Sequence, residues 1–185
     1  MARAVFLDRD GVINRPPPEG LYLTSADDFI LLPGVAEAIG RLNQAGFRVI
    51  VVTNQRGIAR GLVSARTVEE IHARLRMAVR EDGGEIDHVY VCPHDYGDAC
   101  ACRKPKPGML QQAAREYFLN LAECWMVGDK ACDIAAGQAA GCHTVMVSGE
   151  GEVPADFAAA NLAEAVDHIL VAARSDIDTD GHHAK

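Results

Sequence analysis

Residues 4–14 read AVFLDRDGVIN, and this stretch decides the fold. An apolar run ends at Asp8, and Asp10 and Gly11 follow, which predicts a short buried strand ending in two carboxylates. Alternate side chains of an extended chain point to the same side, so Asp8 and Asp10 can converge on one small volume. Ligands of parallel α/β sheets bind at this edge. The alternative interpretation is an ordinary polar turn, because Asp and Gly are common turn residues.

Strand-like and helical patterns alternate along the rest of the chain. Further strands are expected at 47–54, 86–92, 124–129 and 143–148, and helices at 35–44, 67–79, 108–118, 133–141 and 162–173. This alternation predicts an α/β fold, a Rossmann-like three-layer sandwich with a mostly parallel sheet covered on both faces. We expect one domain over residues 1–174 and a polar, disordered tail at 175–185.

Composition narrows the class of function. The 185 residues carry a net charge of −8, which argues against general binding to nucleic acids or anionic membranes. The N-terminus lacks the pattern of a signal peptide, and the apolar runs are shorter than a membrane span. We therefore expect a cytoplasmic protein with reduced thiols. The GxGxxG and GxxxxGK fingerprints of NAD and ATP sites are also missing after the predicted strands.

The predicted strands end in polar residues that would meet at one sheet edge. Asp8 and Asp10 follow the first strand, Thr53 and Asn54 end the second, and Asp129 ends the fourth. The turn RKPKPG (103–108) adds Lys104 as a fixed cation. Together they are the acids, hydroxyl and cation that phosphoryl transfer through an aspartate requires.

Four sequence blocks resemble the haloacid dehalogenase (HAD) superfamily of phosphatases. They are DRDG (8–11), VVTNQ (51–55), RKPKPG (103–108) and MVGDKACD (126–133), and the resemblance covers roughly residues 4–148. It implies a HAD-like fold without a large cap domain. It also implies that Asp8 is the nucleophile, that Asp10 is the general acid and base, and that Asp8, the Asp10 backbone carbonyl and Asp129 hold Mg²⁺.

The same resemblance implies where substrate binds. Thr53 and the backbone after it, at Asn54 and Gln55, would hold the phosphoryl oxygens, and Lys104 would neutralise their charge. Lys130 and Asp133 would orient this cluster. Each also has a plainer interpretation: Lys130 as a solvated lysine at a helix start, Asp133 as an acid favoured at a helix N-terminus.

A second motif is CPHDYGDACACRKP (92–105). Cys92, His94, Cys100 and Cys102 supply three thiolates and an imidazole at the spacing of a closed, structural Zn²⁺ site. Such a zinc would hold the loop rigid so that the following Arg-Lys pair faces the substrate. A buried thiol cluster or a disulfide is the alternative. The remaining cysteines, at 124, 132 and 142, are expected to be packing residues.

Within the superfamily, the zinc loop resembles two groups, the heptose 1,7-bisphosphate phosphatases and the histidinol-phosphate phosphatases. TNQRGIARG (53–61) and the PGM at 107–109 favour the first group, whereas the short segment between His94 and Cys100 is shared with the second. Arg56, Arg60 and Arg103 suit a second phosphate, because a guanidinium binds phosphate through two parallel hydrogen bonds. The alternative for Arg56 and Arg60 is that they are solvated loop cations.

The expected function is therefore removal of the 7-phosphate of D-glycero-D-manno-heptose 1,7-bisphosphate by a monomer, in the supply of heptose for lipopolysaccharide. Histidinol phosphate is the alternative substrate, and Asp95 and Asp98 could then bind its amine and imidazole. A receiver-like phospho-accepting module is an alternative of another class, although such modules lack an acid two residues after the phosphorylated Asp. A catalytically idle zinc-binding interaction protein is the third.

Overall fold

The computed structural model describes residues 2–148 and 154–180, with side chains described as far as Arg174. The strands are β1 (Ala4–Leu7), β2 (Arg48–Asn54), β3 (His88–Cys92), β4 (Trp125–Gly128), β5 (His143–Val147) and β6 (Phe157–Ala159). The helices are α1 (Val35–Gln44), α2 (Ala65–Glu81), α3 (Gly108–Tyr117), α4 (Ala131–Ala140) and α5 (Leu162–Asp180), with short 3-10 helices η1 (Ala26–Asp28) and η2 (Leu121–Glu123).

The six strands form one parallel sheet in the order β3-β2-β1-β4-β5-β6. β1 is central, and its Val5 pairs with Val49 of β2 on one side and Trp125 of β4 on the other. The carboxyl ends of β1, β2 and β4 are therefore neighbours at one edge of the sheet, where their polar end residues can meet.

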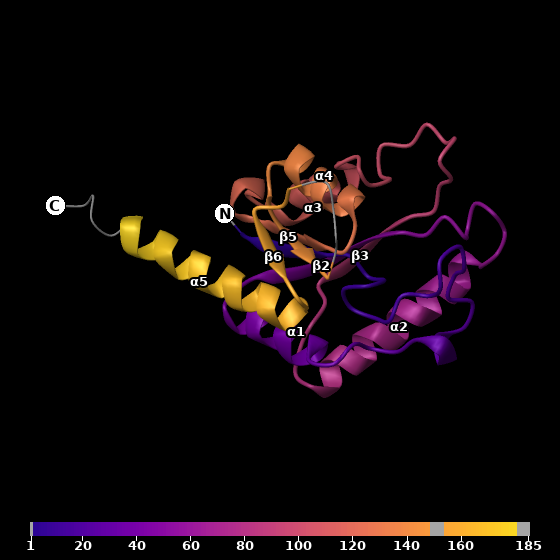
Figure 1. Ribbon diagram of the computed structural model, residues 1–185, viewed down its shortest axis with the longest axis horizontal. Coiled ribbons are helices and arrows are strands. Elements are labelled where there is room, and N and C mark those ends of the chain that lie inside the picture. The colour runs from indigo at the N-terminus through magenta and orange to yellow at the C-terminus, as the bar shows by residue number, and fades with distance from the viewer. Residues whose placement is uncertain (1, 149–153, 181–185) are drawn as a thin grey trace.

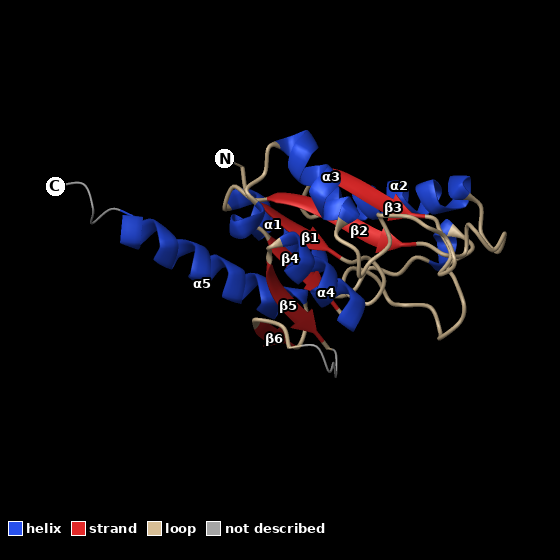
Figure 2. Cartoon of the chain, turned by 90° about the horizontal axis from the view of Figure 1, so that it is seen from above, coloured by secondary structure: helices blue, strands red, loops and turns tan. Residues whose placement is uncertain are grey.

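Helices cover both faces of the sheet, as Figures 1 and 2 show. Val5 and Leu7 pack in one hydrophobic cluster with α1, α2 and α5, whereas Ala4 and Phe6 pack in a second cluster with α3 and α4. The alternation follows from the two-residue period of an extended strand. Because both faces are covered, all four residues of β1 are fully buried.

The predicted three-layer α/β fold is confirmed, and each predicted strand and helix is present. β6 was not predicted, because its three residues lack both β-branched side chains and a buried-exposed alternation. Helix α2 begins two residues earlier than predicted, since the Ser64 side chain accepts a hydrogen bond from the Thr67 amide and caps it. Within the described residues, no segment forms a separate cap domain.

Helix α5 projects from the body of the molecule in Figure 1. The sequence predicts its end at residue 173, but the helix continues to Asp180, since neither Gly nor Pro interrupts residues 174–180. The remainder of the predicted tail, 181–185, lies outside the described residues. In the described part of the chain, no helix combines the length and apolar character needed to cross a membrane.

Candidate active site

A cavity of about 280 Å³ opens at the carboxyl edge of the sheet. Its lining includes Asp8 after β1, Thr53 at the end of β2 and Lys104 from the loop after β3. Asp129, which follows β4, lines an adjoining hollow that shares Asp10 with the first. Side chains predicted from distant sequence blocks are thus brought to one place.

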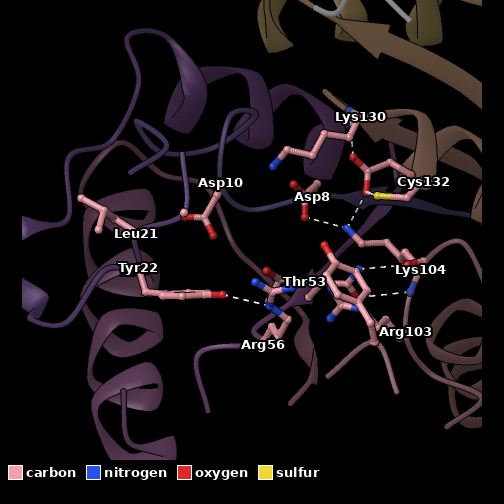
Figure 3. A pocket seen from close by; sticks show the side chains of 14 residues that line it. Asp8, Asp10, Leu21, Tyr22, Thr53, Arg56, Arg103, Lys104, Lys130 and Cys132 are labelled. Carbon is pink, nitrogen blue, oxygen red and sulfur yellow. Dashed lines mark hydrogen bonds and ion pairs between the residues drawn. The ribbon is translucent and has the colours of Figure 1, made fainter. Parts of the chain in front are cut away.

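Lys104 lies between two buried carboxylates. Its Nζ is 2.6 Å from Asp8 Oδ1 and 2.7 Å from Asp133 Oδ1, and it also donates to the Val52 carbonyl. Figure 3 shows the Lys104 side chain directed at Asp8. Burial raises the pKa of Asp8 to about 7, since the attraction of Lys104 only partly offsets desolvation and the repulsion of Asp133. Burial opposes the charge on Lys104, but Asp133 and Asp8 raise its pKa.

Donor atoms of Asp8, Asp129 and Asp133 all lie within 4.8 Å of one another. Both oxygens of Asp133 already have partners, Lys104 and the Lys130 amide. Asp133 is therefore the acid at the N-terminus of α4, as in its plainer interpretation, and it also contacts the cation of the cluster. Asp129 Oδ1, in contrast, is buried without a hydrogen-bond partner, and burial raises the pKa of Asp129 although Lys130 opposes the shift. An oxygen-coordinated divalent cation fits this arrangement, because it would satisfy Asp129 and offset the repulsion between the acids.

Gly11 makes room for that arrangement. A Cβ at Gly11 would lie 2.1 Å from Asp129 Oδ2, and the Gly11 φ of +100° is one that other residues rarely adopt. The glycine of the DRDG block therefore allows β1 and β4 to bring their carboxylates together.

Asp10 is held by several donors. Arg9 Nη2 lies 2.9 Å from Oδ1 and 2.8 Å from Oδ2 of Asp10, Asn14 Nδ2 donates to Oδ1, and Gln55 Nε2 donates to Oδ2. Burial opposes ionisation, but Arg9 and these hydrogen bonds hold the pKa of Asp10 below its ordinary value. To reach a substrate oxygen, the Asp10 carboxylate has to exchange some of these bonds for the substrate.

Arg9 is itself fixed from helix α2. Its Nη1 lies 3.2 Å from Nε2 of the fully buried His72, and because Arg only donates, Nε2 must accept. Burial, together with Arg9 and Arg76, lowers the pKa of His72 to about 3, so the ring is neutral. Sequence reasoning missed both residues: Arg9 stands between two more conspicuous acids, and His72 reads as part of an apolar helix face.

The end of β2 is locked to the Lys104 loop. The Asn54 side chain donates to the Lys104 carbonyl and accepts from the Lys104 amide. Gln55 is buried and bonds to Thr53 Oγ1 as well as to Asp10, so its side chain positions other groups. Of the residues predicted to bind phosphoryl oxygens, Thr53, Asn54 and Lys104 line the cavity.

Two of the three arginines predicted for a second anion site lie at the cavity. Arg56 and Arg103 line the same cavity, and Tyr22 Oη accepts a hydrogen bond from Arg56 Nε. Arg60 is exposed and lies outside the cavity lining, but its side chain reaches the Tyr22 hydroxyl of that lining. Burial opposes the shift, yet Arg56 and Arg60 together lower the pKa of Tyr22. Lys130 lines the cavity with an exposed side chain, and its Nζ lies 3.9 Å from Asp129 Oδ2.

The four predicted zinc ligands are together. One donor atom from each of Cys92, His94, Cys100 and Cys102 lies within 4.8 Å of the others. All six cysteines of the chain are free thiols, so the alternative of a disulfide is wrong. The donor set, three sulfurs and one imidazole nitrogen, fits a tetrahedral Zn²⁺. Cys132 departs from its prediction as a packing residue, because it lines the active-site cavity beside Asp133.

Comparison with known proteins agrees with this geometry. The HAD-hydrolase-like family model matches residues 101–172. The D-glycero-beta-D-manno-heptose-1,7-bisphosphate 7-phosphatase of Pseudomonas aeruginosa is 47% identical over 153 residues, which are 82% of this chain and 85% of the relative. The chain belongs to the HAD superfamily, in the group of these heptose bisphosphate phosphatases. This places it among the phosphoric monoester hydrolases.

Two further relatives are similar over most of their length. The enzyme of the same name from Pseudomonas putida is 45% identical, over 81% of this chain and 85% of the relative. The crystal structure of D,D-heptose 1,7-bisphosphate phosphatase from B. bronchiseptica, complexed with magnesium and phosphate, superposes with a TM-score of 0.85 at 38% identity. It covers 93% of this chain and 99% of that one. The family resemblance predicted from the sequence blocks is confirmed.

Proposed function

We propose that this protein is a Mg²⁺-dependent phosphatase that removes the 7-phosphate of D-glycero-beta-D-manno-heptose 1,7-bisphosphate. One observation carries the proposal: a single cavity combines Asp8, held by Lys104, with the guanidinium groups of Arg56 and Arg103. The first group suits the phosphate that is cleaved and the second suits another phosphate on the same molecule. The names of the relatives and the magnesium and phosphate in the B. bronchiseptica structure support it.

The reaction would pass through an aspartyl-phosphate. Asp8 attacks phosphorus as the bond from phosphorus to the sugar oxygen breaks, and Asp10 gives a proton to that oxygen. Because Asp10 is ionised in the free site, it has to take up this proton as the substrate displaces some of the donors that hold its carboxylate, Arg9 among them. Asp10 then takes a proton from the water that attacks the phosphorus of the aspartyl-phosphate, which frees Asp8 and inorganic phosphate. Thr53 and Lys104 hold the phosphoryl oxygens through both steps.

Asp8, the Asp10 backbone carbonyl and Asp129 would hold the Mg²⁺. When bound, the ion supplies positive charge beside the reacting phosphoryl group and keeps the nucleophile ionised. The raised pKa of Asp8 explains why the nucleophile needs this help, since desolvation otherwise favours its protonated form.

The zinc loop argues against histidinol phosphate as the substrate. That ligand needs acids to bind its amine and imidazole, but Asp98 accepts a hydrogen bond from the Asp95 amide. Asp95 in turn accepts from the Tyr96 amide and lies 3.6 Å from Arg56. Neither acid lines the cavity, whereas Arg56 and Arg103 do, so the part of the cavity beside the zinc loop presents cations to the substrate.

Zinc, cellular location and oligomeric state are part of the same proposal. We infer that Cys92, His94, Cys100 and Cys102 bind a structural Zn²⁺, which fits a cytoplasmic enzyme because thiolates stay reduced there. The enzyme would act as a monomer, and its product would supply heptose for lipopolysaccharide.

A phosphate-release screen tests the proposal. With Mg²⁺ present, heptose 1,7-bisphosphate, heptose 7-phosphate and histidinol phosphate are compared by kcat/KM, with Asp8→Asn as the inactive control. The bisphosphate is expected to give the highest value. A higher value for histidinol phosphate contradicts the assignment, and a stable phosphoprotein without turnover would point to the receiver-like alternative.

A further inference from the structure

Three consecutive residues of the zinc loop contact the two cavity arginines. The His94 carbonyl accepts a hydrogen bond from Arg103 Nη1 at 3.0 Å. Asp95 Oδ1 lies 3.6 Å from Arg56 Nε. The Tyr96 ring contacts both guanidinium groups, with the Cζ of Arg56 4.4 Å and that of Arg103 4.5 Å from its centroid. The loop therefore joins an arginine that follows β2 to one that follows the zinc ligands.

Tyr96 is an unusual residue to find in this position. Its side chain is 75% exposed, so burial of apolar area does not explain an aromatic residue at the tip of a polar loop. It also lines the cavity that contains Asp8. What the ring does in the structure is contact two cations, and the face of an aromatic ring attracts cations.

The charges around this ring favour an anion. Two like-charged guanidinium groups share one ring, and Asp95 lies near one of them only, at a distance and exposure that weaken the pairing. Among the described residues, Arg103 has no carboxylate within ion-pair distance; its contacts are the His94 carbonyl and the Tyr96 ring. A phosphate between the guanidinium groups would supply the missing negative charge and accept paired hydrogen bonds.

We propose that Tyr96 is a specificity-determining positioning residue, which holds Arg56 and Arg103 together as one clamp for the phosphate that is not cleaved. This inference rests on the proposed function, because a second phosphate exists only on a bisphosphate substrate. Two long arginine side chains lose conformational freedom when they bind an anion. A ring that orders both of them beforehand reduces that loss and so increases affinity.

The experiment compares two substrates that differ only in the second phosphate, heptose 1,7-bisphosphate and heptose 7-phosphate. The ratio of their kcat/KM values is measured for the wild type, Tyr96→Leu and Tyr96→Phe. The matched control is Tyr117→Leu, since Tyr117 also stacks on an arginine, with the Cζ of Arg48 5.0 Å from its ring, outside the cavity lining. Because Tyr96 is exposed, Leu at this position is not expected to disturb folding.

Loss of two exposed cation–π contacts is expected to lower the ratio by about 5- to 30-fold in Tyr96→Leu, mainly through KM for the bisphosphate. Phe keeps the ring, so Tyr96→Phe and Tyr117→Leu should keep the wild-type ratio within about twofold. The proposal is overturned if Tyr96→Leu keeps that ratio, if it loses equally on both substrates, or if Tyr96→Phe loses as much as Tyr96→Leu.

A separate arm distinguishes failure of the clamp from failure of the proposed function. If the wild type does not prefer the bisphosphate, the proposed function is wrong, and inorganic pyrophosphate is then tested as an inhibitor of heptose 7-phosphate hydrolysis. Weaker inhibition of Tyr96→Leu than of wild type would support the clamp as a general site for a second phosphate. Equal inhibition would overturn it.

Discussion

Replacing Asp8 by Asn is expected to abolish phosphate release and yet to stabilise the protein in the absence of Mg²⁺. Asp8 and Asp133 are both buried and share one ammonium group, that of Lys104. In the fold the pKa of Asp8 is raised from 3.8 to about 7, mainly by burial. Asn cannot ionise but still offers an oxygen to Lys104, so the variant avoids the cost of a second buried negative charge.

The sign and size of the effect follow from linkage. A carboxyl whose folded pKa exceeds its unfolded pKa contributes full stability below the unfolded value. It loses that stability as the pH rises toward the folded value. For Asp8 the window runs from pH 3.8 to about 7. A shift of this size corresponds to a stability difference on the order of 4 kcal/mol between Asp8→Asn and wild type at pH 8.

The assay is urea unfolding at pH 5 and pH 8 in Mg²⁺-free buffer without chelator, so that metal bound by the cysteines is not removed. The unfolding free energy of Asp8→Asn should exceed that of wild type by more at pH 8 than at pH 5. Excess Mg²⁺ should reduce this difference, because it binds and stabilises the wild type. Asp82→Asn, at an exposed position, serves as the control. An Asp8→Asn variant that is less stable than wild type at pH 8, or whose advantage does not change with pH, refutes the reasoning.

Three other predictions use features of the same site. His72 has a pKa of about 3 in the fold against 6.5 unfolded, so its contribution to stability is present above pH 6.5 and falls below it. Through His72, the wild type should lose about 1.4 kcal/mol of unfolding free energy for each pH unit below pH 6.5, and His72→Gln should not show this loss. Urea unfolding of both proteins at pH 7 and pH 5 measures the difference. Gly11→Ala places a Cβ 2.1 Å from Asp129 Oδ2, so the Mg²⁺ concentration for half-maximal activity should rise at least about tenfold. Protein purified without chelator should contain one equivalent of zinc by elemental analysis, and Cys100→Ser should lower both the zinc content and the melting temperature.

Each of these predictions has an outcome that contradicts it. An unchanged pH dependence in His72→Gln would mean that the ring does not stay neutral in the fold. If Gly11→Ala needs the same Mg²⁺ concentration as wild type for half-maximal activity, Asp129 is not a ligand of the metal. If the wild-type protein contains no zinc, the four proposed ligands do not bind it. Cys142→Ser, at a buried thiol outside the cluster, is the matched control for Cys100→Ser.

Much of the fold was predictable because its signals are local. The apolar run before Asp8 and the β-branched run of β2 identify buried strands, and their alternation with helices predicts a parallel sheet. The zinc ligands were found for the same reason, since all four lie between Cys92 and Cys102. β6 was not predictable, because a three-residue strand with two exposed positions has no apolar or β-branched run.

What the sequence could not give are contacts that depend on register between distant segments. The link from His72 through Arg9 to Asp10 requires one side of α2 to face the end of β1, which no local pattern specifies. The sharing of Lys104 by Asp8 and Asp133 is of the same kind. Local spacing thus predicted which residues lie at the site, but not which of them form hydrogen bonds or ion pairs with each other.

The position of β1 in the sheet has a consequence for how the enzyme matures. β1 is translated before both of its neighbours, and it cannot complete its pairing until β4 has been made. Parallel pairings between segments far apart in the chain form slowly. Phosphatase activity should therefore return late during refolding, together with the burial of Trp125, the single tryptophan, which opens β4.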